Sequence, residues 1–185
     1  KYSSRRLTAE EIWDSYLLLT NQMKFEIGGP PVRPKMPDAV LQTSSRPRNV
    51  WPPSPGDSAN RRAVYIHVKR SIKLPLLANF DSPERDFSCP SRFATTVPTQ
   101  ALTMLNSERM NELSEKFAAR LSGSLDEKIR EAFQLGTSRE VTDGEFHEIK
   151  ELAADLKAKH GVSDDQLMSR ICLLVLNLNE TLYLD

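Results

Sequence analysis

The sequence predicts a mainly α-helical protein, a small bundle of about five helices with a long proline-rich, irregular strap. Two observations carry this prediction. A Ser or Thr followed three residues later by Glu or Gln, the pattern of a capping box, occurs four times ahead of segments with helical apolar spacing. Eight of the twelve prolines fall within residues 28–60, where no apolar period holds. We expect a single domain over residues 1–185.

The first element is an N-terminal helix within residues 1–27. Thr8 and Glu11 form the first capping box, which places the helix start at Ala9. Apolar residues then follow at intervals of three or four, at Ile12, Tyr16, Leu19 and Met23. This spacing predicts a helix from Ala9 to about Met23.

Residues 28–60 form the predicted strap. A structureless stretch of this length is unusual in a compact domain, and it is either disordered or an extended segment on the surface. Apolar residues recur along it and would anchor it, namely Val32, Met36, Val40, Leu41, Val50 and Trp51. We therefore expect a strap that lies on the surface, with a single helical turn at Pro37–Leu41.

Residues 61–98 form an irregular polar segment with two alternatives for its first part. Apolar residues alternate with polar ones at Val64, Ile66 and Val68, which is typical of a β-strand. Pro75 then separates this piece from a second short apolar piece. These features favour a short two-stranded β ribbon in residues 61–81, and a helix that begins at Asn60 is the alternative.

Residues 99–185 are predicted to form the helical bundle. One apolar stripe runs from Gln100 to Leu121. Three further capping boxes follow at intervals of about twenty residues: Ser124 with Glu127, Thr142 with Glu145, and Ser163 with Gln166. Gly136 and Gly161 are the expected helix ends, because glycine accepts the left-handed conformation that terminates a helix. The short connections indicate antiparallel neighbours.

Composition argues against two classes of partner. Lys and Arg number 25 and so do Asp and Glu, which speaks against nucleic-acid binding driven by bulk charge. No apolar run approaches the roughly 18 residues of a membrane-spanning helix, so we expect no membrane insertion. The chain opens at Lys1 without a signal peptide, and we interpret it as the C-terminal region of a larger protein.

The polar residues of the middle segment are the candidate site. They comprise Arg61, Arg62, Arg70, Asp81, Glu84, Arg85, Asp86, Cys89, Arg92 and Gln100. Guanidinium groups bind carboxylates and phosphates through paired hydrogen bonds, so the arginines suit either an internal network or an anionic ligand. We favour the first interpretation, in which arginines and acids satisfy one another and fix the strap to the bundle. In the alternative, the same groups bind an anionic sugar.

No catalytic residue, metal or cofactor is assigned to this chain. The sequence lacks a C-x-x-C-H haem attachment motif, zinc-ligand spacing and glycine-rich phosphate loops. The two cysteines, Cys89 and Cys172, are too few for a disulfide framework, and whether they form one bridge stays open. A nucleophilic pair of Cys89 with His67 is a minor alternative.

A set of short motifs spans nearly the whole chain in a fixed order. It includes Ser4-Arg5-Arg6-Leu7, Gly28-Gly29-Pro30, Asn60-Arg61-Arg62, Phe80-Asp81-Ser82-Pro83, Ser88-Cys89-Pro90-Ser91-Arg92, Thr95-Thr96-Val97-Pro98 and Leu176-Asn177-Leu178-Asn179-Glu180. With this set, the chain resembles the planctomycete-specific C-terminal domain of unknown function that accompanies planctomycete-type cytochrome c domains. Ser91 and Thr181 depart from that family's pattern, and the first departure weakens an anion site.

The resemblance implies a large exported parent protein with a c-type haem in an upstream domain. It also implies an extracytoplasmic location, and it supplies no catalytic residues. We therefore expect a non-catalytic interaction or scaffold domain whose partners are the upstream domains of its own parent chain. The alternative is a polysaccharide-binding or carbohydrate-active domain that uses the acids and arginines of the middle segment.

Overall fold

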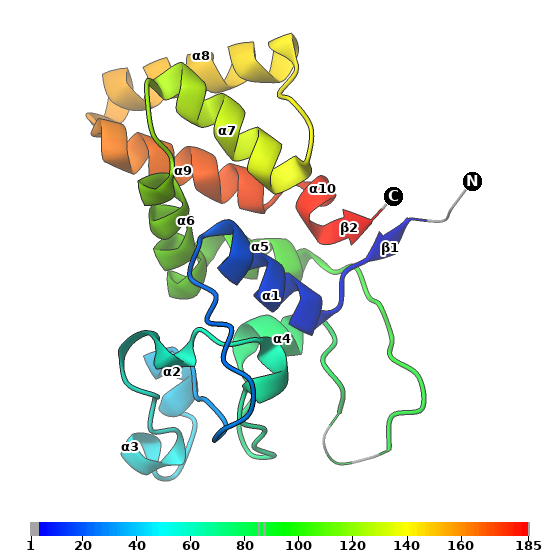
Figure 1. Ribbon diagram of the computed structural model, residues 1–185. Helices are drawn as coiled ribbons and strands as arrows, with labels where there is room; N and C mark the ends of the chain where they lie inside the picture. The colour runs from blue at the N-terminus through cyan, green and yellow to red at the C-terminus, as the bar shows by residue number, and fades with distance from the viewer. Residues whose placement is uncertain (1–3, 85, 87, 185) are drawn as a thin grey trace. The chain divides into compact units, whose positions relative to one another are not determined.

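The computed structural model describes residues 4–84, 86 and 88–184, and it confirms a mainly α-helical chain (Figure 1). The chain forms two compact units. The strap unit comprises residues 6–18 and 22–103. The helical unit comprises the chain from Met104 onward, together with residues 4–5 and 19–21. None of the described helices combines the length and apolar character needed to cross a membrane.

Helix α1, Ala9–Leu19, begins as the capping box predicts. The backbone N–H of Thr8 donates to Glu11 Oε2 at 2.7 Å, and that of Glu11 donates to Thr8 Oγ1 at 3.3 Å. The helix ends at Leu19 rather than at Met23, because Asn21 adopts a left-handed conformation with a φ of 55°.

The strap carries short helical segments: α2 (Asp38–Leu41), α3 (Pro47–Val50) and the 3₁₀ helix η1 (Gly56–Ala59). A second 3₁₀ helix, η2 (Ala63–Tyr65), follows in the next segment. Four predicted anchors, Val32, Met36, Val50 and Trp51, are buried, and Val40 and Leu41 are half-buried. The indole N–H of Trp51 donates to the carbonyl of Pro34 at 2.7 Å. The predicted turn at Pro37–Leu41 corresponds to α2, so the anchored strap is confirmed in these features.

Residues 61–81 form neither the predicted β ribbon nor a helix from Asn60. Within the segment, Lys69 and Ile72 form only an isolated antiparallel bridge, and Ile66 pairs with the strap through an isolated parallel bridge to Val32. Val64 and Val68 are 73% and 64% exposed, so the alternating residues do not bury one face of a strand. Pro75 begins the short helix α4, Pro75–Asn79.

The two-stranded ribbon of the described chain lies elsewhere, between β1 (Arg5–Arg6) and β2 (Tyr183–Leu184). Each strand is only two residues long. An alternation of apolar and polar residues cannot be recognised over so few positions, so the sequence did not predict these strands.

The helical unit contains α6 (Glu108–Arg120), α7 (Leu125–Thr137), α8 (Asp143–His160), α9 (Asp164–Leu176) and α10 (Asn179–Leu182). Helices α6 and α7 both pack against α9 (Figure 1). Apolar residues at helical spacing fill its core, among them Met110, Leu113, Phe117, Ile129, Phe133, Leu167, Ile171 and Val175. The three capping boxes predicted for α7, α8 and α9 are all present, so local signals set where these helices start.

Two details of this region differ from the sequence prediction. The stripe from Gln100 is divided at Ser107 into α5, Pro98–Asn106, and α6, because the Ser107 hydroxyl accepts a hydrogen bond from the backbone N–H of Met110 and caps α6. Gly136 lies inside α7, and Ser138, with a φ of 59°, ends that helix. Gly161 ends α8 as predicted.

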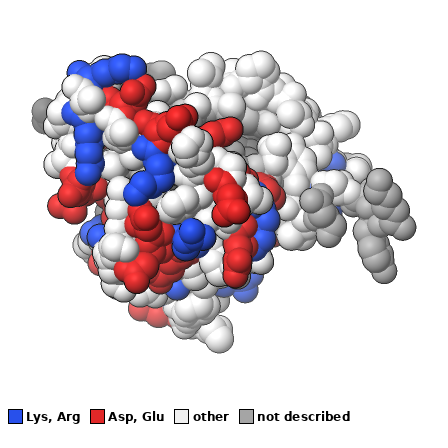
Figure 2. All heavy atoms as spheres, turned by 90° about the horizontal axis from the view of Figure 1, so that it is seen from above, with Lys and Arg blue, Asp and Glu red and all other residues white. Residues whose placement is uncertain are grey.

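The two units carry opposite net charge. By sequence, the strap unit has 13 basic and 9 acidic residues, and the helical unit has 12 basic and 16 acidic residues. Acidic and basic side chains are nevertheless intermingled on the face shown in Figure 2. In the helical unit, Lys150 pairs with Asp126 and Lys159 pairs with Asp155.

Candidate functional site

Asp81 is the centre of one polar cluster in the strap unit. It follows α4 and adopts a left-handed backbone with a φ of 58°. Its carboxylate accepts hydrogen bonds from Arg6 Nη2 at 2.7 Å, from the backbone N–H of Thr95 at 2.8 Å and from the Thr95 hydroxyl at 2.9 Å. The Arg6 and Asp81 side chains are only 6% and 20% exposed. The Asp81 carboxylate is therefore occupied by internal donors.

Gln100 belongs to the same cluster. It is buried, and its amide donates to the carbonyls of Asn79 at 2.8 Å and Thr95 at 3.0 Å. Partial burial alone would raise the pKa of Asp81. The N–H of Thr95, then the Arg6 guanidinium and the Thr95 hydroxyl, outweigh that burial and lower the pKa below its ordinary value. The cluster thus holds an ionised carboxylate that joins the end of α4 to the segment ahead of α5.

Arg61 serves a different purpose from the one predicted. It is 3% exposed, and its guanidinium donates to the carbonyls of Glu26 at 2.8 Å and Pro30 at 3.1 Å, and also to that of Gly28. The guanidinium lies over the Tyr65 ring, 3.9 Å from its centroid. Arg61 therefore fixes residues 26–30, where the strap begins, through backbone carbonyls rather than through a carboxylate.

The remaining predicted residues form separate pairs. The pairs are Arg62 with Asp14 at 2.9 Å, Arg70 with Asp86 at 2.9 Å, Lys73 with Glu84 at 2.8 Å and Arg92 with Glu10 at 2.6 Å. The three predicted acids, Asp81, Glu84 and Asp86, thus each bind a different cation. Exposed pairs of this kind contribute little to stability. Arg85 lies outside the described residues.

Both cysteines are free thiols, which answers the open question about a bridge. Cys89 is exposed, and its thiol donates to the carbonyl of Ser91 at 3.2 Å. Cys172 is buried, and desolvation raises its pKa to about 12, which keeps it protonated. His67 lies against Trp51, with ring centroids 5.8 Å apart. Among the described residues, no three His, Cys, Asp or Glu side chains converge as metal ligands would.

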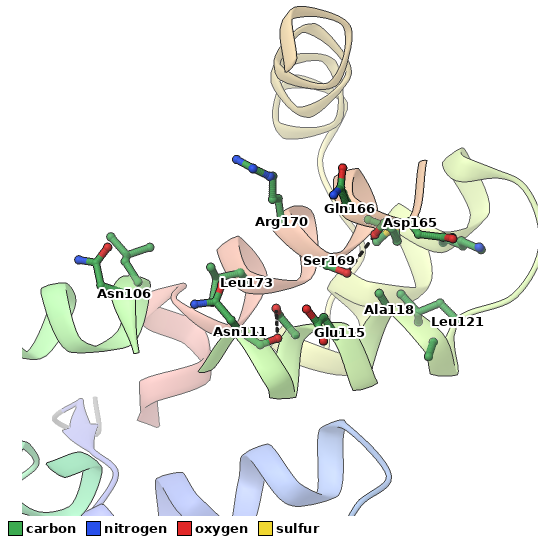
Figure 3. Close-up of a pocket in the computed structure, with 15 residues that line it drawn as sticks. Asn106, Asn111, Glu115, Ala118, Leu121, Asp165, Gln166, Ser169, Arg170 and Leu173 are labelled. Atoms are coloured by element: carbon green, nitrogen blue, oxygen red, sulfur yellow. Dashed lines mark hydrogen bonds between the residues drawn. The ribbon is translucent and has the colours of Figure 1, made fainter. Parts of the chain in front are cut away.

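A groove in the helical unit presents a different arrangement. It has a volume of about 800 Å³ and runs between α6 and α9, with residues from the end of α5 at one side (Figure 3). Its aliphatic lining comes from Leu105, Ala118, Ala119, Leu121, Met168 and Leu173. Its polar lining includes Asn106, Asn111, Glu115, Lys128, Asp165, Gln166, Ser169 and Arg170.

Several polar side chains of this groove have no partner in the described part of the chain, in contrast to those around Asp81. The side chains of Glu115, Asp165 and Arg170 are exposed, and no described residue bonds to them. Unpaired polar groups beside an aliphatic floor are typical of a binding surface. Sequence reasoning missed the groove because charged residues on the outer face of an amphipathic helix look like ordinary solvated positions.

Comparisons with known proteins identify the family but no characterised relative. Searches of curated proteins and of solved structures found no match to the chain. A family model described as PSD1, protein of unknown function (DUF1553), matches residues 1–153. That range includes the strap unit, α6 and α7, and it ends within α8. The chain therefore belongs to the PSD1 family of proteins of unknown function, DUF1553.

Proposed function

We propose that the chain is a non-catalytic interaction domain that scaffolds the other domains of its parent protein. The observation that carries this proposal is the state of the predicted acids and arginines. The described members of that set bind one another, neighbouring side chains or backbone carbonyls, as Asp81 and Arg61 do. A catalytic or ligand-binding acid needs to face a substrate, and these acids accept hydrogen bonds from their own chain instead.

The α6–α9 groove is the proposed docking surface. It combines an aliphatic lining with Glu115, Asp165 and Arg170, which are exposed and have no side-chain partner among the described residues. This mixture is found at protein–protein interfaces with a polar rim. A domain that docks other domains requires such a surface. A partner can occupy the groove while the buried apolar residues of α6 and α9 keep their packing.

The parent protein follows from the sequence resemblance. In this proposal it is exported and planctomycete-specific, it carries a c-type haem in an upstream domain, and the chain positions that haem domain. A charge-balanced surface suits contacts within a large assembly rather than with nucleic acid.

The test measures binding of the chain to the remainder of its parent by isothermal titration calorimetry. Glu115→Arg places a like charge near Lys128 and Arg170, and we expect it to weaken binding at least tenfold. Arg70→Ala is the matched control, because Arg70 is a 73%-exposed cation in the strap unit.

Thermal unfolding of the chain in the presence of sulfated and uronic polysaccharides tests the alternative. If such a polymer raises the melting temperature of the chain and Arg70→Ala with Arg92→Ala abolishes that rise, the chain is a polysaccharide-binding domain and the proposal is wrong. Unchanged binding of the Glu115→Arg chain to its parent would also contradict the proposal.

A further inference from the structure

A loop of the strap unit holds two large apolar side chains in solvent. Phe25 is 76% exposed and Ile27 is 97% exposed. The backbone around them is fixed, because buried Arg61 binds the carbonyls of Glu26 and Gly28, and Lys24 forms a backbone bridge with Arg61. The backbone N–H of Gly28 also donates to the Tyr65 hydroxyl at 3.0 Å. A fixed loop loses little conformational entropy when a partner covers it.

The charges of this loop are also free. Lys24 and Glu26 alternate with Phe25 and Ile27, and both charged side chains lack a partner within the described residues. The loop therefore presents one cation, one anion and two apolar groups in four consecutive residues.

The α6–α9 groove offers the complementary groups. Leu105, Leu121 and Leu173 give it apolar surface, Glu115 and Asp165 give it carboxylates, and Lys128 and Arg170 give it cations. The complementarity extends to the units that carry the two features. The strap unit has an excess of four basic residues and the helical unit an excess of four acidic residues.

We propose that the groove of one copy of this chain binds the Lys24–Ile27 loop of a second copy. This inference rests on the proposed role of the groove as a docking surface, and it adds a second copy of the chain to the partners of that surface. In it, Phe25 and Ile27 cover the leucines, and Lys24 approaches Glu115. The contact joins two different surfaces, so it builds head-to-tail assemblies unless two copies exchange loops about a two-fold axis.

Sedimentation equilibrium of the purified chain, from micromolar to millimolar concentration, tests the proposal. We expect reversible association that weakens at high salt, because the charged groups at its edge are screened. Phe25→Ser with Ile27→Ser should raise the dissociation constant at least tenfold. Phe93→Ser removes an aromatic residue that is 82% exposed outside the loop, and it should leave association unchanged.

Exchanging the charges of Lys24 and Glu115 tests whether these two side chains contact each other directly or only change the overall charge of the chain. Lys24→Glu and Glu115→Lys should each weaken association at least tenfold, and the double variant should recover most of the loss. Each variant changes an exposed side chain, so circular dichroism should show a wild-type fold. A chain that stays monomeric throughout, or a double variant without recovery, would overturn the proposal.

The same variants distinguish the two proposals. If the chain is monomeric while Glu115→Arg weakens binding to the parent, the self-association is wrong and the docking function stands. If groove substitutions change neither association nor binding to the parent, both are wrong.

Discussion

The helical unit and the strap unit are stabilised in different ways. In the helical unit, side-chain caps at Ser124, Thr142 and Ser163 start helices whose apolar stripes then pack together. In the strap unit, long polar side chains reach backbone carbonyls far away in sequence. The indole N–H of Trp13 donates to the carbonyl of Arg61 at 3.0 Å, and Arg61 donates to three carbonyls of the preceding loop.

The difference has a simple physical origin. A helix satisfies its own backbone N–H and C=O groups, so it needs help only at its ends. An irregular strap satisfies few of its own, and buried backbone groups without partners are costly. Arginine and tryptophan supply donors at the end of long side chains, which is why the strap depends on them.

The largest expected effect concerns Arg61. Arg61→Ala removes a buried guanidinium that donates part-buried hydrogen bonds to three backbone carbonyls and contacts the Tyr65 ring, and it should lower the free energy of unfolding by about 3 kcal/mol. Urea denaturation followed by circular dichroism measures the change. Arg62→Ala is the matched control, because Arg62 is 61% exposed and pairs at the surface with Asp14. Equal losses from the two substitutions would show that burial does not distinguish these arginines.

A smaller effect is expected at Gly136 in the helical unit. Alanine normally stabilises a helix interior relative to glycine. A Cβ at Gly136 would instead lie 2.5 Å from Val175 Cγ1, so Gly136→Ala should destabilise the chain by about 1 to 2 kcal/mol. Gly144→Ala in α8 meets no atom within 4 Å, and it should stabilise the chain slightly. Melting curves measure the two stability changes, which should have opposite signs. A stabilising effect of Gly136→Ala would contradict the close packing of α7 at Gly136.

The smallest effect is a pH dependence at the start of α8. The Arg139 guanidinium, the N–H of Thr142 and the Thr142 hydroxyl lower the pKa of Glu145 from 4.5 to about 2, against the opposing effect of burial. A lowered carboxyl pKa stabilises the fold above the unfolded value, and that contribution is lost as the pH falls from about 4.5 towards 2.

Because Glu145 is partly exposed, we expect this contribution to be only about 1 kcal/mol. The free energy of unfolding of the wild type and of Glu145→Gln is compared at pH 6 and pH 2.5. The variant should lose about 1 kcal/mol less than the wild type on acidification. If the wild type and the variant lose the same free energy of unfolding between pH 6 and pH 2.5, Glu145 does not contribute to the pH dependence of stability.

The sequence predicted the helical unit better than the strap unit because its signals are local. A capping box needs only residues three apart, and Thr142 with Glu145 is found by reading along the chain. Ser107 was missed because Met110 continues the apolar stripe across the break between α5 and α6. Gly136 was misread because a glycine at a helix end and a glycine at a close helix contact look alike in sequence.

The sequence predicted the strap unit less well because the contacts of this unit join residues that are far apart in the sequence. Ile66 forms a β-bridge with Val32, and Asp81 accepts a hydrogen bond from Arg6, which lies 75 residues earlier in the chain. The sequence identified Asp81, Arg61 and Gln100 as placed polar residues, and the structure joins Asp81 to Gln100 through Thr95. It did not predict the carbonyl partners of Arg61, since carbonyl groups carry no sequence signature.

Asp81 and Glu115 have different roles: Asp81 stabilises the fold, and Glu115 serves binding. Urea denaturation of Asp81→Ala and Glu115→Ala tests this difference directly. Asp81→Ala should lower the free energy of unfolding by about 2 kcal/mol, because Arg6 and Thr95 lose a shared acceptor. Glu115→Ala should change it by less than about 0.5 kcal/mol. An Asp81→Ala chain as stable as the wild type, or a Glu115→Ala chain destabilised as much as Asp81→Ala, would contradict the account.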